Sequence, residues 1–286
     1  MRNTMLWTIA VLSLAATHSA YAGDCTAAHK LFETGKQAGQ RQQWAEARRA
    51  LEKSVAECNR FDNWYLLGQT QLQLEDYNAA SASFEDARRF AQSNDEKALA
   101  GARYAQVMAQ QGKIDEPLAI LHQARKAHTH PPAWMTELAM SLDKKRVNQP
   151  VTVAQLTRAL TSRSVTLISP NAKPSVNITI NFKYNSTEVT ENSTANIDVL
   201  AEALAGDALY KGPVQLTGHT DARGETQYNK TLSEQRAQTI AAALIARKPE
   251  LKSRLHIAGK GASEPLYPGE SEDIFALNRR IEVTLE

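Results

Sequence analysis

The stretch GHTDARGETQYNKTLSEQRAQTI, from Gly218 to Ile240, places a permanent positive charge where a helix should be apolar. With residues at 100° intervals from Asn229, Arg236 shares one side of the helix with Leu232 and further apolar residues, Ile240, Ala243 and Leu244. A guanidinium keeps its charge, and an unpaired buried charge is strongly destabilising. The candidate anion within this stretch is Asp221, which lies fifteen residues earlier across a turn.

Two interpretations of Asp221 and Arg236 remain open at this point. In the first, the two residues form a buried ion pair that only fixes the helix on the neighbouring sheet. In the second, they are the two poles of an open site for a zwitterion. Asp221 then accepts an ammonium group, and Arg236 binds a carboxylate through two parallel hydrogen bonds. The pattern of residues supports both interpretations equally.

The surrounding sequence predicts a small α+β domain. VNITINF, Val176 to Phe182, alternates apolar and polar residues as a half-buried strand does. A helix follows, then a strand at Val214 to Leu216 that leads into the quoted stretch. After the helix beyond Asn229 come a strand at Arg254 to Ala258, a short helix and the final strand RRIEVTLE. This βαβαβ–β order predicts a mixed sheet with its helices on one face.

Four motifs in this order resemble the OmpA-like peptidoglycan-binding domain, from about Pro174 to Glu286. They are F-x-x-N-S (Phe182, Asn185, Ser186), GHTD-x-x-G (Gly218 to Asp221, Gly224), N-x-x-LS-x-x-RA (Asn229, Leu232, Ser233, Arg236, Ala237) and NRR-x-E-V (Asn278 to Arg280, Glu282, Val283). The resemblance implies non-covalent binding to the stem peptide of peptidoglycan through its diaminopimelate residue, and so favours the open site.

The resemblance also implies a set of ligand-binding residues. Asp221 is expected to hold the amine of the diaminopimelate side chain and Arg236 its carboxylate. The expected neighbours of the ligand are Asn185, Thr220 and Asn229 as hydrogen-bonding residues, Leu232 as a lining residue, and Arg280. For Arg280 two alternatives stay open: the adjacent Arg279 is the inward residue, or the role of Arg280 is structural.

Residues 23–145 predict an all-α solenoid of tetratricopeptide-like repeats. The segment from Asn63 carries the repeat's small and large residues at the expected offsets: Trp64, Leu67, Gly68, Ala80, Phe84 and Ala87. A shift of 33 residues back gives Gly35, Ala47, Leu51 and Ser54, and a shift of 37 forward gives Leu121 and Ala124. PAWMTELAMSLDKK, from Pro132, is predicted to be a terminal capping helix. Such solenoids bind proteins on a concave face; a spacer or a dimerisation element is the alternative.

The first 22 residues predict a secretory signal peptide. Arg2 precedes an apolar run from Met5 to about Ala16, and Ala20-Tyr21-Ala22 forms a cleavage signal. The run is shorter than the roughly 20 apolar residues of a membrane span. We therefore expect a periplasmic protein associated with the cell wall or the outer membrane.

The two cysteines, Cys25 and Cys58, are expected to form a disulfide in an oxidising compartment. Two free buried thiols are the alternative. Asp24 argues against a lipid on Cys25, because lipidation requires a small residue before the cysteine. The bridge would join the start of the first repeat helix to the end of the second.

Residues 146–173 predict a linker with a short helix between Thr152 and Ser162, followed by the OmpA-like domain at 174–286. The chain of 286 residues has a formal charge of +2, without the clustered basic residues of a nucleic-acid-binding protein. The sequence thus predicts two domains after the signal peptide.

The alternative of an enzyme rests on few residues. His219, Asp221 and His256 could form a metal or hydrolase site, but no nucleophile elbow and no Cys–His pair accompany them. We therefore predict no catalysis, no cofactor and no metal. The expected function is an adaptor that binds peptidoglycan and an unidentified envelope protein. A peptidoglycan-modifying enzyme and a self-associating wall anchor are the alternatives.

Overall fold

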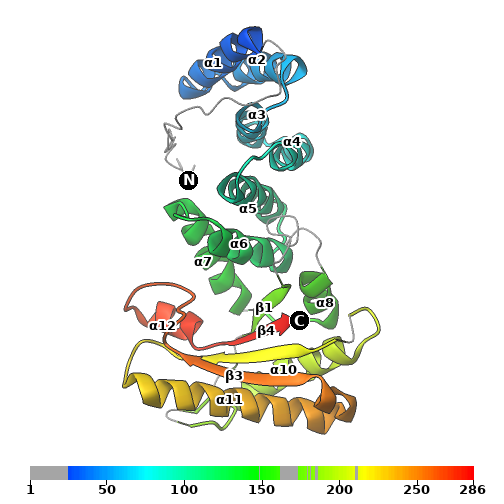
Figure 1. The fold of residues 1–286 in the computed structure, drawn as a ribbon, viewed down its shortest axis with the longest axis vertical. Helices are drawn as coiled ribbons and strands as arrows, with labels where there is room; N and C mark the ends of the chain where they lie inside the picture. Colours follow the sequence, from blue (N-terminus) through cyan, green and yellow to red (C-terminus); the bar gives the residue numbers. More distant parts are fainter. Residues whose placement is uncertain are drawn as a thin grey trace.

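The computed structural model describes residues 25–147, 149–161, 173–178, 180, 182–183, 186–209 and 212–286. The signal peptide predicted for residues 1–22 and the predicted site residue Asn185 lie outside these residues. A column of paired helices stands on a small sheet (Figure 1). Its helices are α1 (Thr26–Gln40), α2 (Trp44–Glu57), α3 (Phe61–Gln73), α4 (Tyr77–Arg89), α5 (Asn94–Gln110), α6 (Asp115–Ala127) and α7 (Ala133–Val147).

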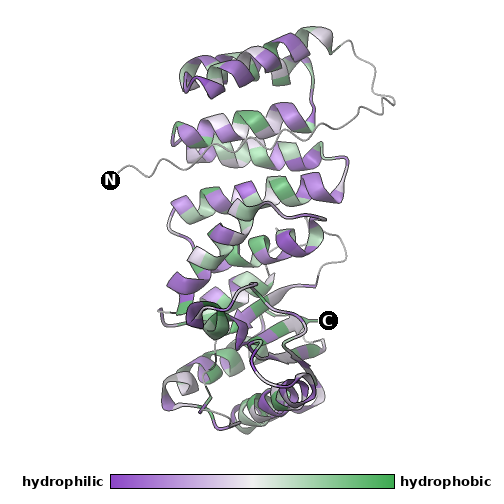
Figure 2. Ribbon diagram, turned by 90° about the vertical axis from the view of Figure 1, so that its left-hand side faces the viewer, coloured by the Kyte–Doolittle hydropathy of each residue, from purple (hydrophilic) through white to green (hydrophobic). Residues whose placement is uncertain are grey.

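In each of the first two helix pairs, a glycine on one helix lies against a large side chain on the other. A methyl group at Gly68 of α3 would lie 2.8 Å from the ring of Phe84 in α4. A methyl group at Gly35 of α1 would lie 2.5 Å from Leu51 in α2. The two contacts are 33 residues apart in the sequence and have the same geometry. They confirm that the first two helix pairs are copies of one repeat. The helices carry both hydrophobic and hydrophilic residues along their lengths, as expected when one side is buried (Figure 2).

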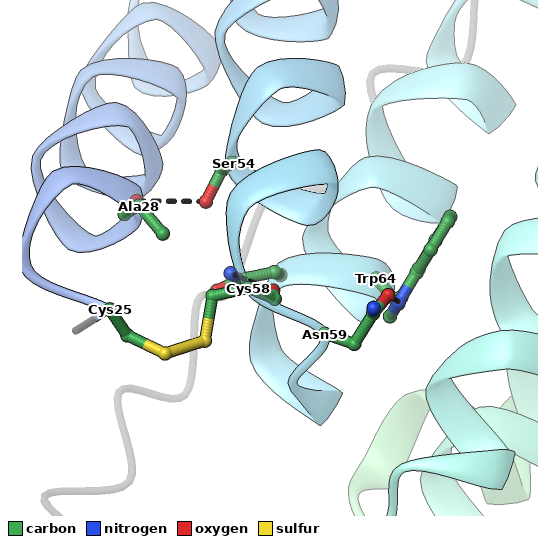
Figure 3. The surroundings of a disulfide bond; sticks show 7 residues. Cys25, Ala28, Ser54, Cys58, Asn59 and Trp64 are labelled. Carbon is green, nitrogen blue, oxygen red and sulfur yellow. Dashed lines mark hydrogen bonds between the residues drawn. A yellow bond between two sulfur atoms is a disulfide. The ribbon is translucent and has the colours of Figure 1, made fainter. Parts of the chain in front are cut away.

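The disulfide between Cys25 and Cys58 is formed and clips the first helix pair (Figure 3). Cys25 immediately precedes α1 and Cys58 immediately follows α2, with their Cα atoms 5.6 Å apart. Beside the bridge, the Ser54 hydroxyl donates to the carbonyl of Ala28 at 2.8 Å. The predicted position of the bridge is therefore confirmed.

The C-terminal half forms a four-stranded mixed sheet in the order β1-β4-β2-β3. Strands β2 and β3 are parallel, whereas β4 is antiparallel to both β1 and β2. The elements are α8 (Val153–Thr161), β1 (Ser175–Ile178), α10 (Glu191–Ala205), β2 (Val214–His219), α11 (Thr226–Arg247), the 3₁₀ helix η1 (Pro249–Ser253), β3 (Leu255–Gly261), α12 (Glu272–Asn278) and β4 (Ile281–Leu285). The predicted fold, a helical solenoid followed by an α+β domain, is confirmed.

Two sets of residues alternate along the strands and give the sheet two different faces. The apolar residues pack against α10 and α11 in one core: Val214, Leu216, Ile281, Val283 and Leu285. Leu156 and Leu160 of α8 belong to the same core, so the short helix expected within a linker is part of the C-terminal packing. On the other face, Glu282 forms an ion pair with Lys126 of α6 at 2.8 Å. The column therefore rests on the polar face of the sheet.

The predicted capping helix α7 is itself covered. Met135, Ala139 and Leu142 of α7 share a core with Tyr267 and Leu277 of the C-terminal half, together with Leu266 and residues of α5 and α6. Solenoids need a terminal helix that closes the apolar core. Here the segment between β3 and β4 completes that closure, and the two domains are joined by a continuous apolar interface.

Candidate functional site

The site begins where β2 ends and α11 approaches it. Asp221 lies two residues after β2, and α11 starts five residues later at Thr226. A methyl group at Gly218 would overlap the backbone carbonyl of Ser233 in α11. Glycine therefore lets the helix lie directly on the strand. This close approach brings the loop with Asp221 beside the first turns of α11.

Arg236 is buried on the core-facing side of α11, as its position in the sequence predicts, with 8% of its surface exposed. Its guanidinium lies 4.8 Å from the centre of the Phe182 ring, and its Nε donates to the carbonyl of Ser186 at 3.1 Å. Both partners belong to the F-x-x-N-S motif. Among the described residues, no carboxylate forms a hydrogen bond or an ion pair with Arg236. The direct pair with Asp221 is not formed.

The charge of Arg236 is compensated only at longer range. Burial lowers the pKa of Arg236, and the positive charge of Arg279 lowers it further. Tyr228 and Asp221 act in the opposite direction through their charges. A stacked aromatic ring stabilises a cation, but it leaves the hydrogen-bonding edge of the guanidinium less occupied than a carboxylate would. Arg236 therefore retains capacity to bind an anionic group.

Asp221 has two other arginine partners. Its Oδ2 accepts from Arg223 at 2.7 Å and from Arg279 at 2.7 Å, and its Oδ1 accepts from the backbone N–H of Arg223 at 3.1 Å. Burial raises the pKa of Asp221, but these hydrogen bonds outweigh burial and lower it to about 2. Asp221 is therefore a fixed negative charge.

Glu272 of α12 joins the same network. It pairs with Arg223 at 3.2 Å and with Arg279 at 2.9 Å, while the Arg223 guanidinium lies 4.5 Å from the centre of the Phe275 ring. Sequence reasoning missed Arg223 and Glu272 and named Arg279 only as an alternative. For Arg223 a signal was present, since a residue two positions after an aspartate often donates its backbone N–H to that side chain.

Thr220 and Asn229 lie on either side of Asp221 in the chain and are both buried. The Thr220 hydroxyl has no hydrogen-bond partner among the described residues, although only 5% of the residue is exposed. Asn229 donates its side-chain N–H to the carbonyl of Arg223 at 2.8 Å and so holds the loop. Leu232 is half-buried one turn further along α11. A buried hydroxyl without a partner is uncommon in folded proteins.

Arg280 points away from Asp221. Its guanidinium donates to Oδ1 of Asn177 at 3.0 Å, to the carbonyl of Glu264 at 3.2 Å and to the carbonyl of Asn278 at 3.4 Å. Burial lowers the pKa of Arg280 to about 10. The structure thus brings Thr220, Asp221, Asn229 and Arg236 to the end of β2 and the start of α11, and places Arg280 elsewhere.

The three residues of the alternative metal site, His219, Asp221 and His256, do not contact one another through any described interaction. His219 is buried with Nε2 3.5 Å from Glu282, and burial lowers its pKa. His256 is exposed on β3, and Asp221 is held by arginines. Within the described ranges there is no group of three or more His, Cys, Asp or Glu residues arranged to hold a metal ion. None of the described helices has the length and apolar character to cross a membrane.

Comparison with known proteins identifies the part of the chain that carries this site. Residues 181–279 match the OmpA family. The C-terminal domain is an OmpA family domain. The match includes Asp221, Arg223, Arg236 and Arg279, and it ends one residue before Arg280.

Three relatives each match between 37% and 40% of this chain. The chain is 32% identical over 105 residues to the peptidoglycan-associated lipoprotein of Pseudomonas aeruginosa, which covers 37% of this chain and 60% of that protein. It is 32% identical over 111 residues to outer membrane porin F of the same organism, covering 39% of this chain and 31% of the porin. The solved structure of the cell wall anchor of the T6SS from Pseudomonas aeruginosa is 31% identical, with 40% of this chain and 80% of that chain covered and a TM-score of 0.35.

Proposed function

We propose that this chain is a non-catalytic periplasmic adaptor that binds peptidoglycan without forming a covalent bond. Its OmpA family domain would hold the diaminopimelate residue of the stem peptide. Its helical repeats would bind an envelope protein and so concentrate that partner at the cell wall. The relatives named peptidoglycan-associated lipoprotein support the ligand, and the helical column supports the second role.

The observation that carries the proposal is a buried Arg236 without a carboxylate partner among the described residues. In the site, Arg223 and Arg279 pair with Asp221 and Glu272, and Arg236 adds a third positive charge that senses Asp221 at longer range. A ligand carboxylate on Arg236 would balance the excess positive charge. A ligand ammonium on Asp221 would join or replace Arg223, whose side chain is 55% exposed. The Thr220 hydroxyl would supply a further hydrogen bond.

The test is co-sedimentation of the chain from residue 23 with purified diaminopimelate-type sacculi. We expect Arg236→Ala and Asp221→Ala to stay in the supernatant while the unmutated protein pellets. Arg247→Ala is the matched control, because Arg247 lies on the same helix and pairs with Asp198. Circular dichroism establishes that each variant is folded. Folded variants of both site residues that still pellet would contradict the site.

The nature of the ligand predicts a difference between wall types. Arg236 needs the side-chain carboxylate of diaminopimelate, which lysine lacks, so walls with lysine in the stem peptide should bind much more weakly. Equal binding to both walls would remove the role proposed for Arg236. The same assay separates an enzyme from an adaptor, because an enzyme would release soluble wall fragments into the supernatant.

The role of the repeats has a separate test. A protein that uses its repeats for self-association would be an oligomer, whereas one that uses them for another envelope protein would be a monomer. Light scattering of the chain from residue 23 distinguishes the two. We expect a monomer, and a stable oligomer would favour the self-associating wall anchor.

A further inference from the structure

The segment between β3 and β4 contributes both to the apolar core of the repeats and to the candidate ligand site. Its apolar residues Leu266, Tyr267 and Leu277 are buried in the core of α5, α6 and α7. Its charged residues Glu272 and Arg279 contact Arg223 and Asp221 in the candidate ligand site. The same short segment therefore contacts the repeats through Tyr267 and Asp221 through Arg279.

A chain of hydrogen bonds connects the repeats to that arginine. The Tyr267 hydroxyl donates to Oδ2 of Asp143 in α7 at 2.6 Å, and His122 of α6 lies 3.1 Å from the same oxygen. The backbone N–H of Tyr267 donates to Oδ1 of Asn278 at 3.0 Å, and Nδ2 of Asn278 donates to the Tyr267 carbonyl at 2.9 Å. Arg279, the next residue, donates to Asp221 at 2.7 Å.

The links from Asp143 to Asn278 are protected from water. Tyr267 and Asn278 are buried, with 0% and 2% of their surfaces exposed, and Asp143 is buried beside them. Burial raises the pKa of Tyr267, and the neighbouring Asp143 charge raises it further, so the hydroxyl stays a donor. A buried charge-assisted hydrogen bond is stronger than a neutral one and fixes the direction of both groups. The chain can therefore set where the backbone of Asn278 and Arg279 lies.

We infer that Asp143 and Tyr267 are positioning residues for the ligand site, so that the last helix of the repeats holds Arg279 against Asp221. The inference rests on the proposed function only for its ligand. The contact between Arg279 and Asp221 orients the carboxylate that receives the ligand ammonium. Loss of the Tyr267 hydroxyl frees the segment, lets Arg279 move and leaves Asp221 less well oriented.

The test compares two substitutions at the same domain interface in the chain from residue 23. Tyr267→Phe removes the hydroxyl that contacts Asp143 and keeps the ring. Lys126→Met is the control, because it removes the ion pair with Glu282 across the interface but does not touch the segment that carries Arg279. The ligand is the diaminopimelate-ending disaccharide-tripeptide released from sacculi, and its affinity is measured by calorimetry. The ¹H–¹⁵N signal of the Arg279 side chain, assigned with Arg279→Lys, reports the contact with Asp221 directly.

We expect Tyr267→Phe to shift the Arg279 signal and to weaken ligand binding about three- to tenfold, the range for a mispositioned hydrogen bond to a charged group. Lys126→Met should change neither. In the Arg279→Lys background, the effect of Tyr267→Phe on affinity should disappear, because the two residues act through one contact. An unchanged Arg279 signal, or an equal loss of affinity in both backgrounds, would overturn the inference.

Two further outcomes, absence of ligand binding and failure of Tyr267→Phe to fold, can be distinguished from failure of the inference. If the unmutated protein does not bind the disaccharide-tripeptide, the proposed function fails, and the Arg279 signal without ligand still decides whether Tyr267 positions that residue. If Tyr267→Phe does not fold, Asp143→Ala takes its place, since it removes the acceptor of the Tyr267 hydroxyl. A wild-type Arg279 signal in a folded Asp143→Ala protein would count against the inference.

Discussion

At the scale of single residues, two adjacent arginines have different surroundings, one in the candidate ligand site and one in the interior. Arg279 contacts Asp221, whereas Arg280 donates to Asn177 and to backbone carbonyls on the other side of the chain. Their hydrogen-bond partners differ, so the two guanidiniums occupy different sites. Arg279 is part of the charged network at the ligand site, and Arg280 fills the interface between the sheet and the column.

We predict opposite effects for the two arginines. Arg280→Gln should lower the free energy of unfolding by about 2–4 kcal/mol, because it leaves buried acceptors unpaired and removes a buried positive charge near Glu282. Arg279→Gln should change stability by less than about 1 kcal/mol, since the pair is partly exposed, but should reduce wall binding. Denaturant unfolding and co-sedimentation measure both quantities. A folded Arg280→Gln protein with normal stability and lost wall binding would reverse this assignment.

The low pKa of Asp221, about 2, predicts how acid affects stability. The unfolded value is about 3.9, so the folded state binds protons less readily, and the stabilisation is fully present above that value and lost as pH falls toward about 2. Asp221→Asn lacks this contribution. The difference in melting temperature between the two proteins should therefore shrink between about pH 5 and pH 2, measured at constant ionic strength. A difference that stays constant over this range would show that Arg223 and Arg279 do not stabilise the charge.

At the scale of elements, one glycine fixes the position of the helix that carries Arg236. A methyl group at Gly218 would overlap the backbone of Ser233, and backbone cannot rotate away as a side chain can. Gly218→Ala should therefore cost about 3 kcal/mol or more by forcing α11 off β2. Gly112→Ala is the control: its φ of +82° costs about 1–2 kcal/mol, but the methyl group meets nothing within 4 Å. Denaturant unfolding decides, and a loss below about 1 kcal/mol for Gly218→Ala would contradict this packing.

The sequence predicts a structural feature well when the residues that form it recur at a fixed spacing or follow the period of a helix. The repeats were predictable because Gly35 with Leu51 and Gly68 with Phe84 recur at one spacing. The burial of Arg236 was predictable because helical periodicity assigns a side to each residue. The partners of Asp221 were not fully predictable, since Arg279 reaches it from another element, 58 residues along the chain.

The domain interface was equally hidden in the sequence. Leu266, Tyr267 and Leu277 lie in and around a short helix whose apolar residues have no extended period. The predicted linker helix gave no sign that it packs into the C-terminal core. Contacts between distant segments depend on the three-dimensional arrangement of elements, which local patterns do not contain.

At the scale of the whole molecule, the repeats and the OmpA family domain pack against each other. The apolar core around Tyr267, the Lys126–Glu282 ion pair and the contact of Lys144 with Asp273 at 2.8 Å all cross the same interface. Figure 1 shows the column rising from one side of the sheet while α11 covers the other. An apolar interface with two ion pairs fixes the position of the repeats relative to the OmpA family domain.

Because the two domains share this core, we predict that a destabilising substitution at the interface loosens both of them. Tyr267→Ala removes the largest fully buried side chain of the described residues and should cost about 3–5 kcal/mol. Hydrogen exchange followed by mass spectrometry should show lost protection in α6 and α7 as well as in the segment between β3 and β4. Helices α1 and α2, closed by the Cys25–Cys58 bridge, should keep their protection and serve as the internal control. Lost protection confined to the C-terminal segment would mean that the repeats fold independently, and that a partner bound to them is free to move relative to the wall.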